Sequence, residues 1–506
     1  KVSRMQKSKV FLAILDIFFL IGLMAYAFAG KDLVPFHGDE STLIALSKDY
    51  FLLVEDQDPS SILYRDPGAG WTGDRQFNRI MTGAIDSLTI GQALQLNGMS
   101  ADDLNNLWEW YDPLTGRALG IYYNAGWGNL PTDAVLHTAR TPSTSFFCLS
   151  ILVVFMIARS ISKYRWAAYG SSLLYTLTPS VLVNGRRAMQ EGALLLFSAL
   201  VILVTILTIK NQQNWTEKPQ TPANWYALLG LVSGLAVASK HMAVIAVAVS
   251  YLVVLIAPVI LRSKTTPFNW RHIFALIASG ILSIEIFFLF MPIWWDPGRL
   301  ILLAGLSALF FTLAWERKDW RVSAARAAAV LVVFLVTTIK PAVWPELAEP
   351  PRLMITWRNW LMDIQARQVS QFNSLPERGT YLLNQAFFAS SEYFESLPWA
   401  EFKDTIAQIE NYENAHLDGH GGGILVGILL VGLFILGIWA LASRPFNEIS
   451  LLLFLWLLVP AGVLLLTNQL PWQRYYLIIQ QQLALFFGLG LAQVISLLQK
   501  KRNTVI

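Results

Sequence analysis

The sequence has little charge for its length and almost no cysteine. Only 14% of its 506 residues are charged, whereas 55% are hydrophobic. A soluble globular domain carries about 25% charged residues, so this composition excludes an ordinary soluble protein. The single cysteine, Cys148, excludes a disulfide within these residues and a cysteine-based metal cluster.

In place of charge, the chain has repeated apolar runs of roughly 20 residues, the length that spans a bilayer as a helix. The first run, within residues 9–30, is longer than the apolar part of a signal peptide, so we expect a retained span. We predict an all-α integral membrane protein with about twelve transmembrane helices. The predicted spans are residues 9–29, 143–161, 166–183, 187–209, 224–240, 242–261, 273–293, 299–315, 323–339, 423–443, 449–467 and 475–498.

The distribution of Lys and Arg predicts how these spans are oriented. With the first residue inside, the inner connections hold 19 Lys and Arg against four Asp and Glu. Short cytoplasmic connections carry such an excess of positive charge. Both termini are therefore expected in the cytoplasm, with the protein in the plasma (inner) membrane. The formal net charge of +4 reflects this asymmetry and gives no reason to expect nucleic acid as a partner.

Two long segments then fall outside the membrane, residues 30–142 and 340–422. Loops of this length usually carry function or structure of their own. The first contains amphipathic runs that suit helices on the membrane surface. We therefore divide the chain into a transmembrane module over residues 1–339, a second outer loop over 340–422, and C-terminal transmembrane helices over 423–506.

Ionisable and aromatic side chains collect at the outer ends of the predicted spans. Such groups are costly at membrane depth and usually face a cavity or one another, so we expect a polar pocket there. These residues are Asp39, Glu40, Arg140, Arg187, Glu191, Lys240, His241, Arg474 and Tyr475. Glu285 lies deeper, in the seventh span, and is expected to support the site.

A pocket of this kind suits one chemistry in particular. Several cations at headgroup level would hold the phosphate of a lipid, and a nearby carboxylate would accept a proton from a nucleophile. Asp39 and Glu40 precede a predicted helix, whose N-terminal dipole favours their ionised forms.

Each feature also has a structural explanation. Cations at span ends often only anchor helices in the headgroups, and Arg187 and Glu191, four residues apart, would neutralise each other on one helix. His416, Asp418 and His420 have the side chains of metal ligands, but their glycine-rich setting provides no geometric restraint.

The order of these segments resembles a known family. "DESTLIALSKDY" after the first span is similar to the Asp-Glu segment of GT-C membrane glycosyltransferases. The groups it resembles are the protein O-mannosyltransferases and the lipid A aminoarabinose transferases with their bacterial relatives. The segments "RRAMQEGALLLF", "GLAVASKHMAV" and "RYYLIIQQQLALFFGLGL" are also similar to segments of these enzymes.

The resemblance implies a GT-C-like transferase that moves a sugar from a polyprenyl-phosphate carrier to a lipid, glycan or protein acceptor at the outer face. Asp39 would be the general base of an inverting reaction, with Glu40 supporting it or the sugar. Arg187, Lys240 and Arg474 would bind the lipid phosphate, together with Arg140, His241 and Tyr475 around the donor.

Two other functions stay open at this point. A secondary transporter shares the plan of twelve spans with both termini inside, although such proteins tend to have repeats and sites at the membrane midplane. A catalytically inactive subunit of a larger complex would keep the same fold. No cofactor follows from these residues, and a divalent metal is left as an alternative.

Overall fold

The computed structural model describes residues 2–65, 74–110, 119–211, 220–260, 270–314, 343–368, 372, 374–388, 423–468, 470 and 472–504. Over these ranges the regular secondary structure is helical and contains no β-strand. The predicted all-α fold class is therefore confirmed.

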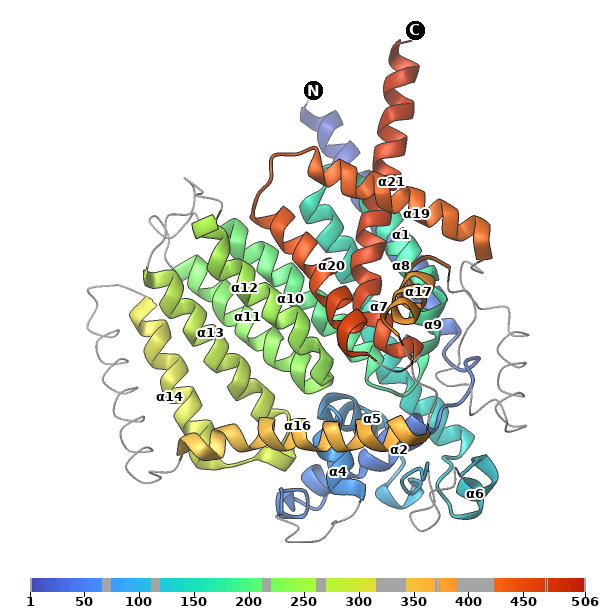
Figure 1. Ribbon diagram of the computed structural model, residues 1–506, viewed down its shortest axis with the longest axis vertical. Helices are drawn as coiled ribbons and strands as arrows, with labels where there is room; N and C mark the ends of the chain where they lie inside the picture. Colours follow the sequence, from blue (N-terminus) through green and yellow to red (C-terminus); the bar gives the residue numbers. More distant parts are fainter. Residues whose placement is uncertain are drawn as a thin grey trace.

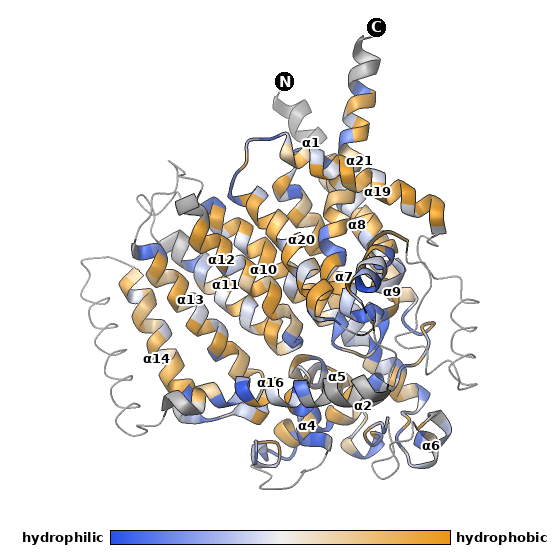
Figure 2. Cartoon of the chain, viewed as in Figure 1, coloured by the Kyte–Doolittle hydropathy of each residue, from blue (hydrophilic) through white to orange (hydrophobic). Residues whose placement is uncertain are grey.

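Eight helices in the described ranges are long and apolar enough to cross a membrane. Figure 2 shows their predominantly hydrophobic colouring, in contrast to the mixed colouring of the outer-loop helices. The helices that contain these segments are α1 (Val2–Ala29), α7 (Asp133–Ile161), α10 (Glu191–Asn211), α13 (Trp270–Leu289), α14 (Pro297–Ala314), α19 (Gly423–Ala442), α20 (Glu448–Thr467) and α21 (Leu477–Thr504) with the turn before it.

The remaining predicted spans have different outcomes. The fifth and sixth correspond to the shorter apolar parts of α11 (Gln220–Ser239) and α12 (Val244–Ile260). The third is two helices, α8 (Arg165–Leu177) and α9 (Pro179–Arg186). The chain is extended at Thr178, with φ −67° and ψ 120°, because the residue before a proline disfavours the α conformation. The ninth, residues 323–339, lies outside the described residues, so the number twelve is not confirmed.

Helix α21 is packed closely against two others, α8 and α19. A Cβ atom at Gly488 would collide with Ser171 Oγ and the Ala167 carbonyl on α8, and one at Gly490 would collide with the Leu433 carbonyl on α19. Small residues at such positions let helix backbones approach within a bilayer. The two glycines therefore let α21 pack closely against both α8 and α19.

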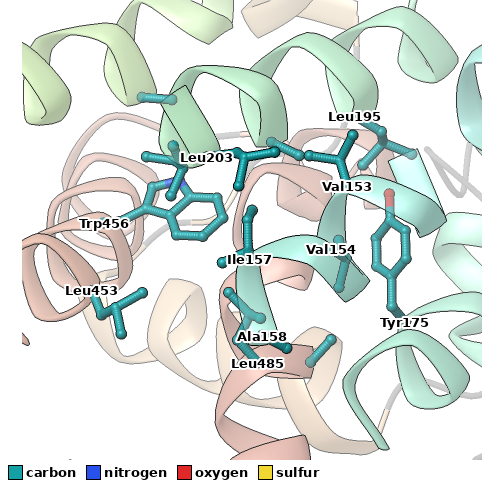
Figure 3. Close-up of a cluster of buried hydrophobic side chains, with 14 of the residues drawn as sticks. Val153, Val154, Ile157, Ala158, Tyr175, Leu195, Leu203, Leu453, Trp456 and Leu485 are labelled. Carbon is teal, nitrogen blue, oxygen red and sulfur yellow. The ribbon is translucent and has the colours of Figure 1, made fainter. Parts of the chain in front are cut away.

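Aliphatic and aromatic side chains fill the space between the spans (Figure 3). Trp456 of α20 is 1% exposed and packs in the same cluster as Ile157 of α7, Leu203 of α10 and Leu485 of α21. Lipid tails are as apolar as these side chains, so the cluster is stabilised mainly by van der Waals contacts between well-fitted surfaces. It gives the outer residues a rigid support.

The described residues of the predicted first outer loop include five short α-helices at one end of the bundle. Both ends of the chain lie at the opposite end (Figure 1). Leu43 and Ile44, together with Leu94 and Val135, form an apolar cluster that attaches this loop to α7. The loop helices are α2 (Gly38–Leu46), α3 (Lys48–Val54), α4 (Asp74–Met81), α5 (Ala84–Leu96) and α6 (Ile121–Gly126).

The second long loop also contributes helices. Helix α16 (Val343–Gln368) runs across the ends of the spans rather than along them (Figure 1). Trp357 of α16 stacks on Phe77 of α4, with ring centroids 5.3 Å apart, so the two outer loops contact each other. Helix α17 (Leu375–Leu383) follows, and Arg378 Nη1 donates to the Leu466 carbonyl, 3.0 Å away, near the end of α20.

Candidate active site

The two adjacent carboxylates lie in the first turn of α2. His37 caps the helix: its Nδ1 accepts a hydrogen bond from the Asp39 backbone N–H at 3.1 Å. The Glu40 side chain accepts from the His37 backbone N–H at 3.0 Å, which completes a capping box. The positive end of the helix dipole therefore lies at both carboxylates. Because side chains on successive helical residues point in different directions, Asp39 and Glu40 have different surroundings.

Glu40 is fully buried and saturated with donors. Arg140 Nε and Nη2 donate to its two oxygens at 2.8 and 2.9 Å, and the Ala188 backbone N–H donates at 2.9 Å. Burial opposes ionisation, but Arg140, Arg187 and the Ala188 N–H outweigh it and hold the pKa of Glu40 below its usual range. Glu40 therefore joins α2 to α7 and to the segment between α9 and α10, a positioning role.

Asp39 is the accessible carboxylate of the pair. Its side chain is 28% exposed, and Arg474 Nη1 donates to its Oδ2 in an ion pair. The Arg474 guanidinium lies 4.9 Å from the ring centroid of Trp472 and 5.8 Å from that of Tyr475, close enough for cation–π attraction. The turn η8 (Gln473–Tyr476) therefore presents a cation to the exposed acid.

Three guanidinium groups surround the Asp39–Glu40 pair. Arg140 binds Glu40 and Arg474 binds Asp39, as described above, while Arg187 donates from Nε to the Pro35 carbonyl at 3.2 Å and acts electrostatically on Glu40. Three positive charges thus face two negative ones. This surplus makes the site suited to one further anionic group.

Lys240, predicted beside Arg187 and Arg474, is ion-paired with an acid. Its Nζ binds Oε1 of Glu191, the first residue of α10. The neighbouring His241 places Nε2 3.0 Å from the Ile80 carbonyl. A Cβ atom at Gly83 would collide with the Ser239 carbonyl at the end of α11, so the start of α5 lies directly on this turn.

The structure adds Asp86, which the sequence analysis passed over, to this second cluster. Asp86 of α5 is 1% exposed, and neither of its oxygens has a hydrogen-bond partner among the described residues. Burial and the nearby Glu191 raise its pKa well above the usual range, against the smaller opposite effect of Lys240. No signal in the sequence distinguished Asp86 from other acids in the first turn of a surface helix.

The other predicted residues have separate surroundings. Tyr475 stacks on Trp472 at 5.5 Å between centroids. Glu285, expected to support the site, lies on α13, with Ser307 Oγ of α14 3.5 Å from its Oε2. His416, Asp418 and His420 fall outside the described residues. Within the described part, no group of three or more His, Cys, Asp or Glu side chains is arranged to hold a metal.

A family model matches part of the chain. The model described as dolichyl-phosphate-mannose-protein mannosyltransferase matches residues 113–294. The resemblance to protein O-mannosyltransferases is confirmed. The matched stretch includes Arg140, Arg187, Glu191 and Lys240, whereas Asp39 and Arg474 lie outside it.

Several solved structures are similar to parts of this chain. The S. cerevisiae Pmt1-Pmt2 complex bound to its sugar donor is 14% identical over 61% of this chain and 33% of that chain, with a TM-score of 0.36. ArnT from Cupriavidus metallidurans bound to undecaprenyl phosphate is 13% identical over 95% and 77%, with a TM-score of 0.36. An Archaeoglobus fulgidus oligosaccharyltransferase with a tethered acceptor peptide is 12% identical over 92% and 50%, with a TM-score of 0.33.

The chain spans about a third of the length of the yeast chain that it matches. No curated protein matches it in sequence.

Proposed function

We propose that the protein is a membrane glycosyltransferase that takes a sugar from a polyprenyl-phosphate carrier and transfers it to an acceptor hydroxyl at the outer face. The observation that carries this proposal is the ion pair between the accessible Asp39 and Arg474, inside a site with three guanidinium groups and two carboxylates. The family match over residues 113–294 supports the same reaction class.

Arg474 and Asp39 would separate when the donor binds. A phosphate oxygen competes with the Asp39 carboxylate for the guanidinium, and Arg binds phosphate well because its donors match the anion's geometry. Negative charge grows on the phosphate as the bond to the sugar breaks, so a fixed cation at that position stabilises the transition state. Arg187 would add to the positive potential without itself changing partners.

Once released, Asp39 would act as general base. The acceptor hydroxyl loses its proton to Asp39 as its oxygen bonds to the anomeric carbon, and the polyprenyl phosphate leaves with the electrons of the old bond. A single base opposite a departing phosphate gives direct displacement, which inverts the anomeric configuration. Glu40 would hold the start of α2 in place throughout, because its oxygens are already occupied by Arg140, His37 and Ala188.

The test uses purified protein in lipid nanodiscs with a panel of polyprenyl-phosphate sugars and simple acceptors. We expect release of polyprenyl phosphate and a product whose anomeric configuration, measured by NMR, is opposite to that of the donor. Product with retained configuration would contradict the single-base reaction. No turnover of any donor, together with no binding of polyprenyl phosphate, would overturn the proposed function.

The site is proposed to face away from the cytoplasm. A cysteine introduced at Asp58, in the first outer loop, should react with a membrane-impermeant maleimide on intact cells. A cysteine at the exposed Lys163, between α7 and α8, should react only after the cells are opened. Cys148 is buried and provides a low background. Reversed labelling would place the site in the cytoplasm.

A further inference from the structure

Two indole rings lie against the backbone next to the proposed base. A Cβ atom at Gly38 would lie 2.7 Å from Trp108 Cε2 and Nε1 and 2.8 Å from Trp110 Cη2. Gly38 immediately precedes Asp39, so only a glycine lets the two rings approach this part of α2. The rings therefore lie beside the first turn of α2, which carries Asp39.

These indoles belong to a group of four rings. Trp108 and Trp110 have centroids 5.7 Å apart, Phe36 lies 5.6 Å from Trp108, and His37 lies 5.7 Å from Trp110. All three pairs are tilted, at interplanar angles of 54–60°. The rings therefore meet at their edges rather than stacking face on face.

The segment that carries the two indoles is tied to α2 and to its own neighbours. Asn105 Nδ2 donates to Ser41 Oγ at 2.7 Å and to the Ser41 carbonyl at 3.0 Å. The Glu109 backbone N–H donates to Asn124 Oδ1 at 2.9 Å, and Asn124 Nδ2 donates back to the Glu109 carbonyl at 3.0 Å. A binding surface held by such bonds is preorganised, so less entropy is lost when a ligand orders on it.

One polar atom in this group lacks a partner. Trp108 Nε1 is buried and has no hydrogen-bond partner in the described part of the chain. A buried indole N–H usually donates to something. An apolar ligand would leave the Trp108 N–H without an acceptor. A phosphate would bind the nearby guanidinium groups instead. A ring that carries both C–H faces and hydroxyl oxygens fits the rings and the N–H together.

We propose that Trp108 and Trp110 form the platform for the neutral sugar ring of the lipid-linked donor. The proposal rests on the proposed function. A sugar joined directly to a phosphate at Arg474 must lie beside Asp39, and Gly38 brings the two indoles to that position. The C–H face of the sugar packs on the Trp110 ring, and a hydroxyl oxygen accepts from Trp108 Nε1.

The experiment compares two lipids that differ only in the sugar. Binding of polyprenyl phosphate and of polyprenyl-phosphate mannose is measured by microscale thermophoresis on protein in nanodiscs. We expect Trp110→Leu to weaken binding of the glycosylated lipid about tenfold. Trp108→Phe, which keeps an aromatic ring but removes the N–H, should weaken this binding about threefold. Binding of the sugar-free lipid should stay within about twofold of wild type and also reports correct folding.

Trp127→Phe is the matched control, because Trp127 lies nearby in the same outer loop and is 66% exposed. It should leave the affinity for both lipids unchanged. Equal weakening of both lipids by the Trp108 and Trp110 variants, or no weakening of either, would overturn the platform. Wild-type protein that binds both lipids equally would overturn it while leaving lipid-phosphate binding intact. Wild-type protein that binds neither would overturn the proposed function and the platform together.

Discussion

Two charge clusters involve residues of the first loop, and they are balanced in opposite ways. Around α2, three guanidinium groups and backbone donors serve Asp39 and Glu40. At α5, among the described residues, Lys240 is the cation that pairs with Glu191 and acts electrostatically on Asp86. The first cluster has positive charge to spare, whereas the second lacks one positive charge. An excess cation suits a site to an anionic ligand, whereas burial and a neighbouring carboxylate raise the pKa of Asp86.

The largest expected effect is on turnover at Asp39. Asp39→Asn removes the proposed proton acceptor while keeping the shape of the side chain, so turnover of a polyprenyl-phosphate sugar should fall by about two to four orders of magnitude. Affinity for the donor should not fall, because the phosphate then no longer competes with a carboxylate for Arg474. Near-normal turnover would mean that Asp39 is not the base and only stabilises the N-terminus of α2.

The next effect distinguishes Glu40 from Asp39, because changing Glu40 should lower the stability of the protein. Glu40→Gln leaves the buried Arg140 charge uncompensated and should lower the free energy of unfolding by about 3–5 kcal/mol. Denaturant titration in mixed micelles measures this loss. The double variant Glu40→Gln with Arg140→Gln should recover part of it, since no charge is then left alone. Full stability of the single variant would contradict the positioning role of Glu40.

A third comparison tests which of the two clusters binds the lipid phosphate. Arg474→Gln should weaken binding of polyprenyl phosphate about tenfold, because it removes a charge-assisted hydrogen bond. Lys240→Gln should leave this affinity within about twofold, since the Lys240 charge is already used by Glu191. Similar losses in both variants would place Lys240 at the phosphate, as the sequence suggested.

The clusters should also respond to pH in opposite directions. Glu40 has a lowered pKa, so its contribution to stability is present above the usual value of 4.5 and is lost as pH falls through the lowered pKa. Asp86 has a raised pKa, so its contribution is complete below the usual value of 3.8 and is lost as pH rises through the raised pKa. Melting temperatures measured across pH in nanodiscs give both slopes.

The smallest expected effect is that of Asp86→Asn at acidic pH. The neutral amide replaces a neutral acid, so stability should change by less than about 1 kcal/mol, and the loss of stability at higher pH should disappear. Asp49→Asn is the contrasting control. Asp49 is ion-paired with Arg79 of α4, so the same change there should destabilise the protein. An unchanged pH profile in the Asp86 variant would mean that Asp86 carries no proton.

The sequence predicted long elements better than broken ones. Apolar runs identified the eight long spanning helices, because hydropathy is a local property. The break at Thr178 was missed although Pro179 signals it, since the apolar run continues through both α8 and α9. Helix α16 was expected only as part of a loop; Pro350 and Pro351 lie within it and disguise its helical pattern.

For the candidate site, the sequence predicted the residue types but could not pair them. Asp39 and Glu40 were recognised from their place before a helix, and Arg474 from its place before a span. Whether Lys240 faces Arg474 or Glu191 depends on how the helices pack, which no local pattern records. Asp86 was missed for the same reason, because its burial arises when α5 is placed on the end of α11.

The distance along the chain between Asp39 and Arg474 has a consequence for biosynthesis. The two residues are separated by 435 positions, which a ribosome takes on the order of half a minute to translate at about 5–20 residues per second. During that interval the first loop has been made without the turn that carries Arg474. The proposed catalytic centre would therefore be completed late, and a growing chain would present the proposed base to the membrane well before it could hold a phosphate on Arg474.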